Sequence, residues 1–225
     1  MEQQELRTKL APLEDAEYKA FSEKLKVSAH PVLGIRTPVL RSFAKTLEPL
    51  PFLESFVTYV NPSYEEVCCA YLSIGRVREK EETIRFLDLL LPLNDGWATN
   101  DLLCSSLKQV GKHPEEYWDY LKGKLSSPSD WDKRFSIISL MDWYLKNSYA
   151  KEAIALVASA PCSSFYVMLA VAWFLATALI THESEVLPLL EKGKIDEKAR
   201  KKAIQKAIES YRISDAMKAR LRSMR

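Results

Sequence analysis

The sequence predicts an all-α protein built as an α-solenoid, in which helix pairs of HEAT-like length stack around a curved concave face. Two observations favour this fold class. Only 6 glycines occur in 225 residues, and no Asn-Gly or Asp-Gly pair lies between alternating apolar residues. Residues that form the tight turns between the strands of a sheet are therefore scarce. The 11 prolines fall at gaps between segments of helical periodicity, where they end one helix or occupy the first turn of the next.

The segments between these prolines have the apolar periodicity of amphipathic helices. In chain order, helices are expected near residues 14–26, 38–47, 52–60, 63–76, 80–91, 97–110, 114–124, 131–146, 149–158, 163–181, 183–191, 196–210 and 214–223. Most of them have three or four turns and short connections, which is typical of helix pairs in a solenoid. No segment is long enough to be a linker, so we expect a single domain over residues 1–225.

Two helix starts carry recognisable caps. Thr37 before Pro38 is expected to be an N-cap followed by a proline in the first turn. Ser129 and Asp130 offer a similar cap ahead of Trp131. These features concern architecture and leave the function open.

Residues 162–181 contain no charged side chain and therefore need weighing as a membrane span. A spanning helix needs about 20 predominantly apolar residues with suitable flanks. Here Cys-Ser-Ser at one end and Thr-His-Glu after the other leave a shorter apolar core. We expect a helix buried inside a helical protein and no contact with a membrane.

The charge of the chain is unevenly distributed. Residues 191–225 hold 12 basic and 5 acidic side chains, whereas residues 1–190 hold 20 basic and 25 acidic ones, and the net charge of +2 conceals this. The asymmetry predicts a positive surface on one side of the curve that faces a polyanion. The alternative is that KARKKAIQK is a solvated helix face.

The cysteines do not form a recognisable framework. Cys68, Cys69, Cys104 and Cys162 include no CxxC pair, and the N-terminal sequence has no basic-then-apolar signal layout. We expect reduced thiols and a cytoplasmic location.

Trp97 and Asp101 form the first candidate site. Four residues apart near the start of a helix, they share one face, which Cys104, Ser105 and Lys108 are expected to continue. An aromatic ring beside a carboxylate suits a cationic ligand. The alternative is an ordinary acidic residue in a first turn, where it favours the helix dipole.

Lys133 and Arg134 form a second candidate, because two cations in the first turn of a helix oppose its dipole. Basic side chains beside unpaired amides suit an anion such as phosphate. The alternative is local neutralisation by Asp130 and Asp132.

Trp173 lies midway along the uncharged helix with Ala170, Ala176 and Thr177 as its neighbours one turn away. The small residues leave the indole open as a shelf for a flat ligand. They also suit the close approach of a second helix or ordinary aromatic core packing.

Metal and nucleotide sites are not indicated. The three histidines His30, His113 and His182 lie far apart, and no second histidine or cysteine follows any of them at helical spacing. No P-loop, GxGxxG or GxSxG sequence occurs. We therefore expect no metal and no cofactor.

Four segments together resemble the AlkD-like DNA alkylation-repair glycosylases, a family built from HEAT-like repeats. They are LGIRTPVLRSFAKTL at residues 33–47, WATND at 97–101, WDKRF at 131–135 and VAWFLA at 171–176. With the C-terminal KAIQKAIESYRIS, the resemblance runs in order from about residue 14 to residue 215.

The resemblance implies an enzyme of base excision repair that hydrolyses the N-glycosidic bond of cationic N3- or N7-alkylated purines in duplex DNA, without flipping the base. Asp101 matches the catalytic carboxylate, and Trp97 and Trp173 match the aromatic residues that line the deoxyribose and backbone. Arg134 matches an arginine that grips the phosphate backbone. The expected partner is double-stranded DNA with alkylated bases, bound by a monomer that associates with the nucleoid.

Two positions depart from the family pattern. Ala176 stands where an arginine is expected, and Leu169 stands where a lysine is expected, so two phosphate-facing charges are absent. DNA binding is then expected to depend more on other basic residues. These are Arg36, Arg41, Lys198, Arg200, Lys201 and Lys202.

Two alternatives to the glycosylase remain. The chain could be a non-catalytic relative that binds DNA, as the missing charges favour, or a HEAT-like scaffold that binds a protein. A steep fall of DNA affinity with salt would separate the DNA-binding hypotheses from the scaffold.

Overall fold

The computed structural model describes residues 1–191 and 195–224, and in these residues it contains helices and no strand. The predicted all-α class is therefore confirmed. By their internal contacts the residues form two compact units, 1–112 and 113–225, and each is described by itself. The expectation of a single domain with a curved concave face stays a prediction.

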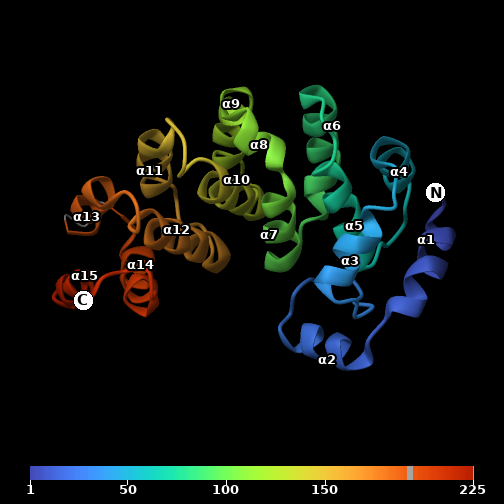
Figure 1. Ribbon diagram of the computed structural model, residues 1–225, viewed down its shortest axis with the longest axis horizontal. Coiled ribbons are helices and arrows are strands. Elements are labelled where there is room, and N and C mark those ends of the chain that lie inside the picture. The colour runs from blue at the N-terminus through green and yellow to red at the C-terminus, as the bar shows by residue number, and fades with distance from the viewer. Residues whose placement is uncertain (192–194, 225) are drawn as a thin grey trace. The chain divides into compact units, whose positions relative to one another are not determined.

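The first unit contains eight α-helices and two short 3-10 helices within its residues (Figure 1). They are α1 (Gln3–Leu10), η1 (Ala11–Leu13), α2 (Ala16–Lys24), α3 (Thr37–Ala44), α4 (Pro49–Phe56), α5 (Tyr64–Ile74), α6 (Lys80–Leu90), η2 (Leu91–Leu93), α7 (Trp97–Ser106) and α8 (Lys108–Lys112). The central helix is α5, which is buried along its whole length and packs against α3, α4, α6 and α7.

The start of α5 explains how a fully buried helix satisfies its first amides. Ser63 accepts a hydrogen bond from the backbone N–H of Glu66, and the Glu66 carboxylate accepts one from the N–H of Ser63. This capping box pairs two donors that would otherwise be buried without partners.

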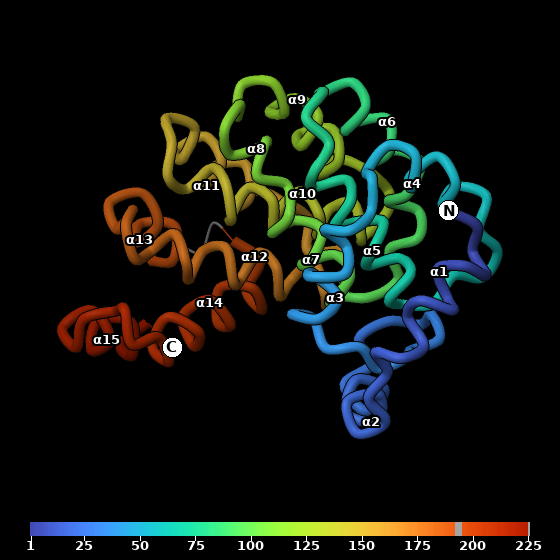
Figure 2. The backbone as a smooth tube through the Cα atoms, turned by 45° about the vertical axis from the view of Figure 1, so that its right-hand side comes forward, coloured from blue at the N-terminus to red at the C-terminus, as the bar shows by residue number. Residues whose placement is uncertain are grey.

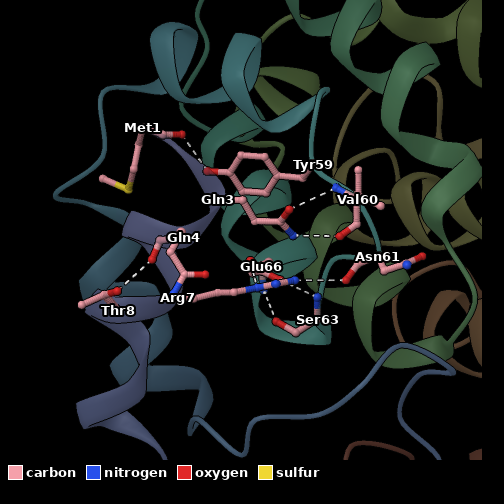
Figure 3. A network of polar contacts seen from close by, with 10 residues as sticks. All are labelled: Met1, Gln3, Gln4, Arg7, Thr8, Tyr59, Val60, Asn61, Ser63 and Glu66. Carbon is pink, nitrogen blue, oxygen red and sulfur yellow. Dashed lines mark hydrogen bonds and ion pairs between the residues drawn. The ribbon is translucent and has the colours of Figure 1, made fainter.

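Helix α1 was not expected from the sequence, because only Leu6 and Leu10 of it are buried. Polar contacts hold it against the segment before α5 (Figure 3). Arg7 forms an ion pair with Glu66 at 3.1 Å, and the Gln3 amide both donates to and accepts from the backbone of Val60. The position of α1 therefore depends on these hydrogen bonds together with the burial of Leu6 and Leu10.

The second unit is organised around α12 (Figure 2). Its helices are α9 (Pro114–Leu125), α10 (Asp130–Trp143), α11 (Ala150–Ala158), α12 (Phe165–Ala178), α13 (Glu183–Glu191), α14 (Glu197–Glu209) and α15 (Asp215–Arg222). Helix α12 packs against α10, α11, α13 and α14. It has 14 residues, and none of the described helices is long and apolar enough to cross a membrane.

Most predicted helices are present within two or three residues of their expected ends. Helices in both units pack on their neighbours along the chain, as α4 and α6 do on α5 and as α9 does on α10, which is the packing of an α-solenoid. The expected cap at Ser129 is confirmed, because its side chain accepts from the N–H of Asp132.

Three local expectations were wrong. Thr37 is the first residue of α3, and Arg36 occupies the N-cap position. The single helix expected over residues 97–110 is broken at Leu107, whose ψ of 60° is not helical. Every proline was expected at a gap between helices or in a first turn, but Pro188 lies inside α13. Proline has no N–H to donate to the carbonyl of Ser184, four residues earlier. Both residues are exposed, so water can bond to that carbonyl.

Candidate functional site

The first turn of α7 is held by the loop that precedes it. Gly96 is the N-cap, and a Cβ atom at this position would lie 2.1 Å from the carbonyl oxygen of Val27. The Asp95 carboxylate accepts hydrogen bonds from the backbone N–H groups of Ala29 and His30, at 2.9 and 2.8 Å. The close approach of these two segments fixes the point at which Trp97 begins the helix.

Helix α7 has a buried face and a half-exposed face. Thr99 and Asn100 are fully buried, and the Thr99 hydroxyl donates to the carbonyl of Gly96 at 3.0 Å. Trp97 and Asp101 are each half-buried and lie one turn apart. The predicted shared face of these two residues is therefore open to solvent in part, and their chemical role stays a prediction.

Two residues predicted to continue this face do not do so. Cys104 is fully buried, and its thiol donates to the Asn100 side chain at 3.6 Å. The residue one turn before Cys104 is Asn100, which explains why the thiol joins the buried face. Lys108 belongs to α8, after the break at Leu107. Ser105 is exposed, as expected.

The start of α10 is tied to the start of α12 by its basic residues. The Lys133 ammonium lies 3.0 Å from the Ser163 hydroxyl and 3.4 Å from the Asp130 carboxylate. The hydrogen bond from Ser163, with a further contribution from Lys133, holds the pKa of Asp130 below its usual value. Asp130 therefore neutralises Lys133 locally, which was the alternative to an anion site. The role of Lys133 as a DNA contact stays a prediction.

Arg134 is likewise withdrawn from solvent, with 5% of the residue exposed. Its guanidinium donates to the carbonyl of Tyr166 at 3.0 Å, and the Tyr166 ring packs on Trp131 with ring centres 5.1 Å apart. Arg134 therefore helps to place the first turn of α12, the helix that carries Trp173. Its predicted phosphate contact stays a prediction.

Trp173 is 39% exposed, so it is not an ordinary core tryptophan. It lines a pocket of about 210 Å³ with Ala176 of the same helix. Lys206 of α14 and Arg212 of the following loop also line this pocket. Two cations from another part of the chain, together with the carboxylate of Glu209, therefore line the pocket beside Ala176, where the expected arginine is absent.

The basic residues predicted on α14 differ in their availability. Arg200 donates to Glu197 at 2.9 Å and to the backbone carbonyls of Leu190 and Met224, so it joins α14 to its neighbours. Lys201 pairs with Glu197 at 3.3 Å.

Lys202 and Lys198 are less strongly held. The Lys202 ammonium donates to the Gln205 amide oxygen at 3.1 Å, and Lys198 is exposed. Of the four predicted cations on this helix, only these two have no carboxylate partner among the described residues.

The two arginines predicted near α3 also have different surroundings. Arg36 is exposed, pairs with Asp15 at 2.8 Å and lies over the Tyr18 ring at 5.1 Å. Arg41 donates to the Ser105 hydroxyl at 3.1 Å and lines a pocket of about 350 Å³. Arg41 is thus connected to the helix that carries Asp101.

The remaining candidates for metal ligands are the thiols and the histidines. None of the four cysteines forms a disulfide, and three of them are buried. His113 lies with Glu115 and Glu116 at the start of α9, with their ligand atoms within 4.8 Å of one another. All three are exposed, and exposed acidic clusters are common without an ion, so the expected absence of a metal stays a prediction.

A family model described as DNA alkylation repair enzyme matches residues 3–211. The chain belongs to this family. A comparison with curated proteins gave no match. The match covers both units and includes every residue predicted for the site. Membership in the DNA alkylation repair enzyme family gives the chain a role in DNA repair and makes DNA its expected substrate.

Several basic residues that face pockets were not found from the sequence. These are Lys45 and Arg76 in the first unit and Lys206 and Arg212 in the second. The apolar period of α14 offered a signal for Lys206. Ala199, Ala203 and Ala207 mark the buried face of that helix, and Lys206, three residues after Ala203, lies at the edge of this face beside the neighbouring elements. Arg212 lies in a loop, where no period exists. For a DNA alkylation repair enzyme, such cations are candidates for contacts with the phosphate backbone.

Proposed function

We propose that this member of the DNA alkylation repair enzyme family is a monofunctional glycosylase that removes cationic N3- or N7-alkylated purines from duplex DNA without base flipping. One observation carries the proposal. In a chain of this family, Trp97 and Asp101 lie one turn apart on the half-exposed face of α7. An indole beside a carboxylate suits a positively charged reaction centre.

The chemistry follows from the charge of the lesion. An alkylated purine already carries a positive charge, so it leaves readily when the bond between its ring nitrogen and C1′ breaks and the bonding electrons go to that nitrogen. The sugar is left with a developing cation at C1′. Asp101 stabilises this cation and orients a water molecule, whose oxygen bonds to C1′ while its proton passes to the carboxylate or to solvent.

The surroundings of Trp173 support the same proposal. Its exposed indole offers a face to the sugar-phosphate backbone, and Lys206 and Arg212 line the same pocket. These two cations provide charge beside Ala176, where the family pattern places an arginine. The absence of that arginine is therefore compatible with binding to DNA.

The test is release of 7-methylguanine and 3-methyladenine from alkylated duplex DNA by the purified protein. We expect release by the wild-type chain and a loss of about a hundredfold or more in single-turnover rate for Asp101→Asn. Asp119→Asn, which changes an exposed carboxylate of α9, is the matched control and should leave the rate unchanged.

Other outcomes distinguish the alternatives. Salt-sensitive DNA binding by folded protein that releases no base would establish the non-catalytic DNA-binding relative, which the uncharged Leu169 and Ala176 favour. Absence of both DNA binding and excision would favour the protein-binding scaffold. An unchanged rate for Asp101→Asn would remove Asp101 from the catalytic role.

A further inference from the structure

The first unit has a pocket whose charged lining is entirely basic. A volume of about 350 Å³ at the ends of α3, α5 and α7 is lined by the hydroxyl of Ser105 and by four basic residues, which are Arg41, Lys45, Arg76 and Lys108. No carboxylate lines it. Within the described residues, none of these four cations forms an ion pair.

This arrangement is not explained by the helix ends alone. The C-terminal end of a helix carries a partial charge of roughly −0.5, so three such ends hold about −1.5 against four full positive charges. Arg76 does serve a helix end, because its guanidinium donates to the carbonyls of Ala44 and Leu47 at 2.7 and 2.6 Å. The other cations leave an excess of positive charge whose self-repulsion an anion would relieve.

The pocket is also held in shape. Arg41 is oriented by its hydrogen bond to Ser105, and the Ser105 hydroxyl can also donate to the carbonyl of Leu102. Lys45 and Lys108 are exposed at the rim. A partly fixed guanidinium with mobile ammonium groups beside it suits a phosphate, which has several acceptor oxygens.

We infer that this pocket binds a backbone phosphate of the DNA substrate, close to the nucleotide whose sugar Asp101 stabilises in the proposed reaction. The inference rests on the proposed function for its ligand. Ser105 follows Asp101 by one turn of α7, a rise of about 6 Å. A phosphate held by Arg41, which Ser105 orients, would therefore position the sugar relative to the carboxylate. Lys45 and Lys108 are positioning residues in this scheme.

The experiment compares duplex-DNA affinity over a range of salt concentrations for the full chain and two double variants. Lys45→Gln/Lys108→Gln removes the two lysines at the rim of the pocket. We expect weaker binding at low salt and a slope of log affinity against log salt that is smaller by about 2. Lys24→Gln/Lys80→Gln, which removes two lysines outside the pocket, is the matched control and should keep the wild-type slope.

A second measurement reads the pocket without DNA. Inorganic phosphate should raise the Tm of the wild-type chain and of the control, and should raise that of Lys45→Gln/Lys108→Gln much less. An unchanged salt slope for the pocket variant would overturn the inference, even if the wild-type chain excises bases. A wild-type chain that binds no DNA would overturn the proposed function. If phosphate still raised its Tm through this pocket, the ligand would be a small phosphorylated molecule and the DNA assignment would be wrong.

Discussion

At the residue scale, one buried carboxylate organises the loop that leads into α3. Glu65 is fully buried, and its two oxygens accept hydrogen bonds from the backbone N–H groups of Leu33, Gly34 and Ile35 at 2.8, 2.8 and 3.1 Å. Gly34 has a φ of 95°, which favours glycine. This turn leads directly to Arg36, so the buried Glu65 of α5 helps to determine the position of a residue that was predicted to contact DNA.

Glu65→Gln is expected to lower the free energy of unfolding by about 1–3 kcal/mol. The amide has one acceptor oxygen in place of two, and its NH₂ group would face a backbone donor, so at least one buried N–H loses its partner. A urea titration followed by circular dichroism measures the change.

Glu81→Gln is the control for this measurement, because Glu81 is exposed in the first turn of α6. It should change the unfolding free energy by less than about 0.5 kcal/mol. Equal effects of the two substitutions would show that the cradle around the Glu65 carboxylate does not stabilise the fold.

At the element scale, α14 separates cations that hold the fold from cations that face a pocket. Arg200 and Lys201 are paired with Glu197, whereas Lys206 has no ion pair among the residues that the structure describes. Glu209 also lines the pocket and adds one negative charge beside the two cations; its carboxylate accepts a hydrogen bond from the Gln205 amide at 2.8 Å. A basic helix therefore cannot be treated as one uniform DNA-binding surface.

Lys206→Gln/Arg212→Gln is expected to lower the salt slope of DNA binding by about 2, because both cations line the pocket beside Trp173. Lys201→Gln/Lys202→Gln on the same helix should have a smaller effect, since Glu197 already neutralises Lys201. The slopes are measured by fluorescence anisotropy with one labelled duplex. The reverse order of effects would favour the basic segment that the sequence predicted.

At the scale of the whole molecule, ion pairs connect stability to pH. Hydrogen bonds from Arg200, with a further contribution from Lys201, lower the pKa of Glu197 from 4.5 to about 2. Between these two values the unfolded chain binds more protons than the folded chain, so this contribution to stability rises with pH. It is fully present above about pH 4.5 and is lost as the pH falls toward 2.

Glu197→Gln should therefore show a shallower loss of stability than the wild-type chain between about pH 4.5 and pH 2. The urea midpoint at a series of pH values measures this difference. Glu23→Gln, at an exposed position of α2, should follow the wild-type curve. An identical curve for Glu197→Gln would show that its ion pairs with Arg200 and Lys201 do not contribute to folding.

The sequence allowed most helices to be predicted, because apolar periodicity and proline positions reflect local geometry. Helix α1 escaped prediction since it has only two buried apolar residues to show a period, and its polar contacts join Arg7 and Gln3 to residues more than 50 positions away. The break at Leu107 was missed because the apolar period continues through it. The pairing of Trp97 with Asp101 was accessible because both belong to one helix.

The sequence by itself determined the all-α class, the family resemblance and the residues that recur within single helices. Only the tertiary structure decided which cations are engaged and which face open pockets. Arg200 and Lys206 are both basic residues of α14. Arg200 donates to three acceptors, the Glu197 side chain and two backbone carbonyls, whereas Lys206 lines a pocket. The physical reason is that the helical period fixes the direction of a side chain and its partners on the same helix, such as Glu197 for Arg200. The backbone carbonyls and pocket walls that a side chain meets are supplied by residues distant in the chain.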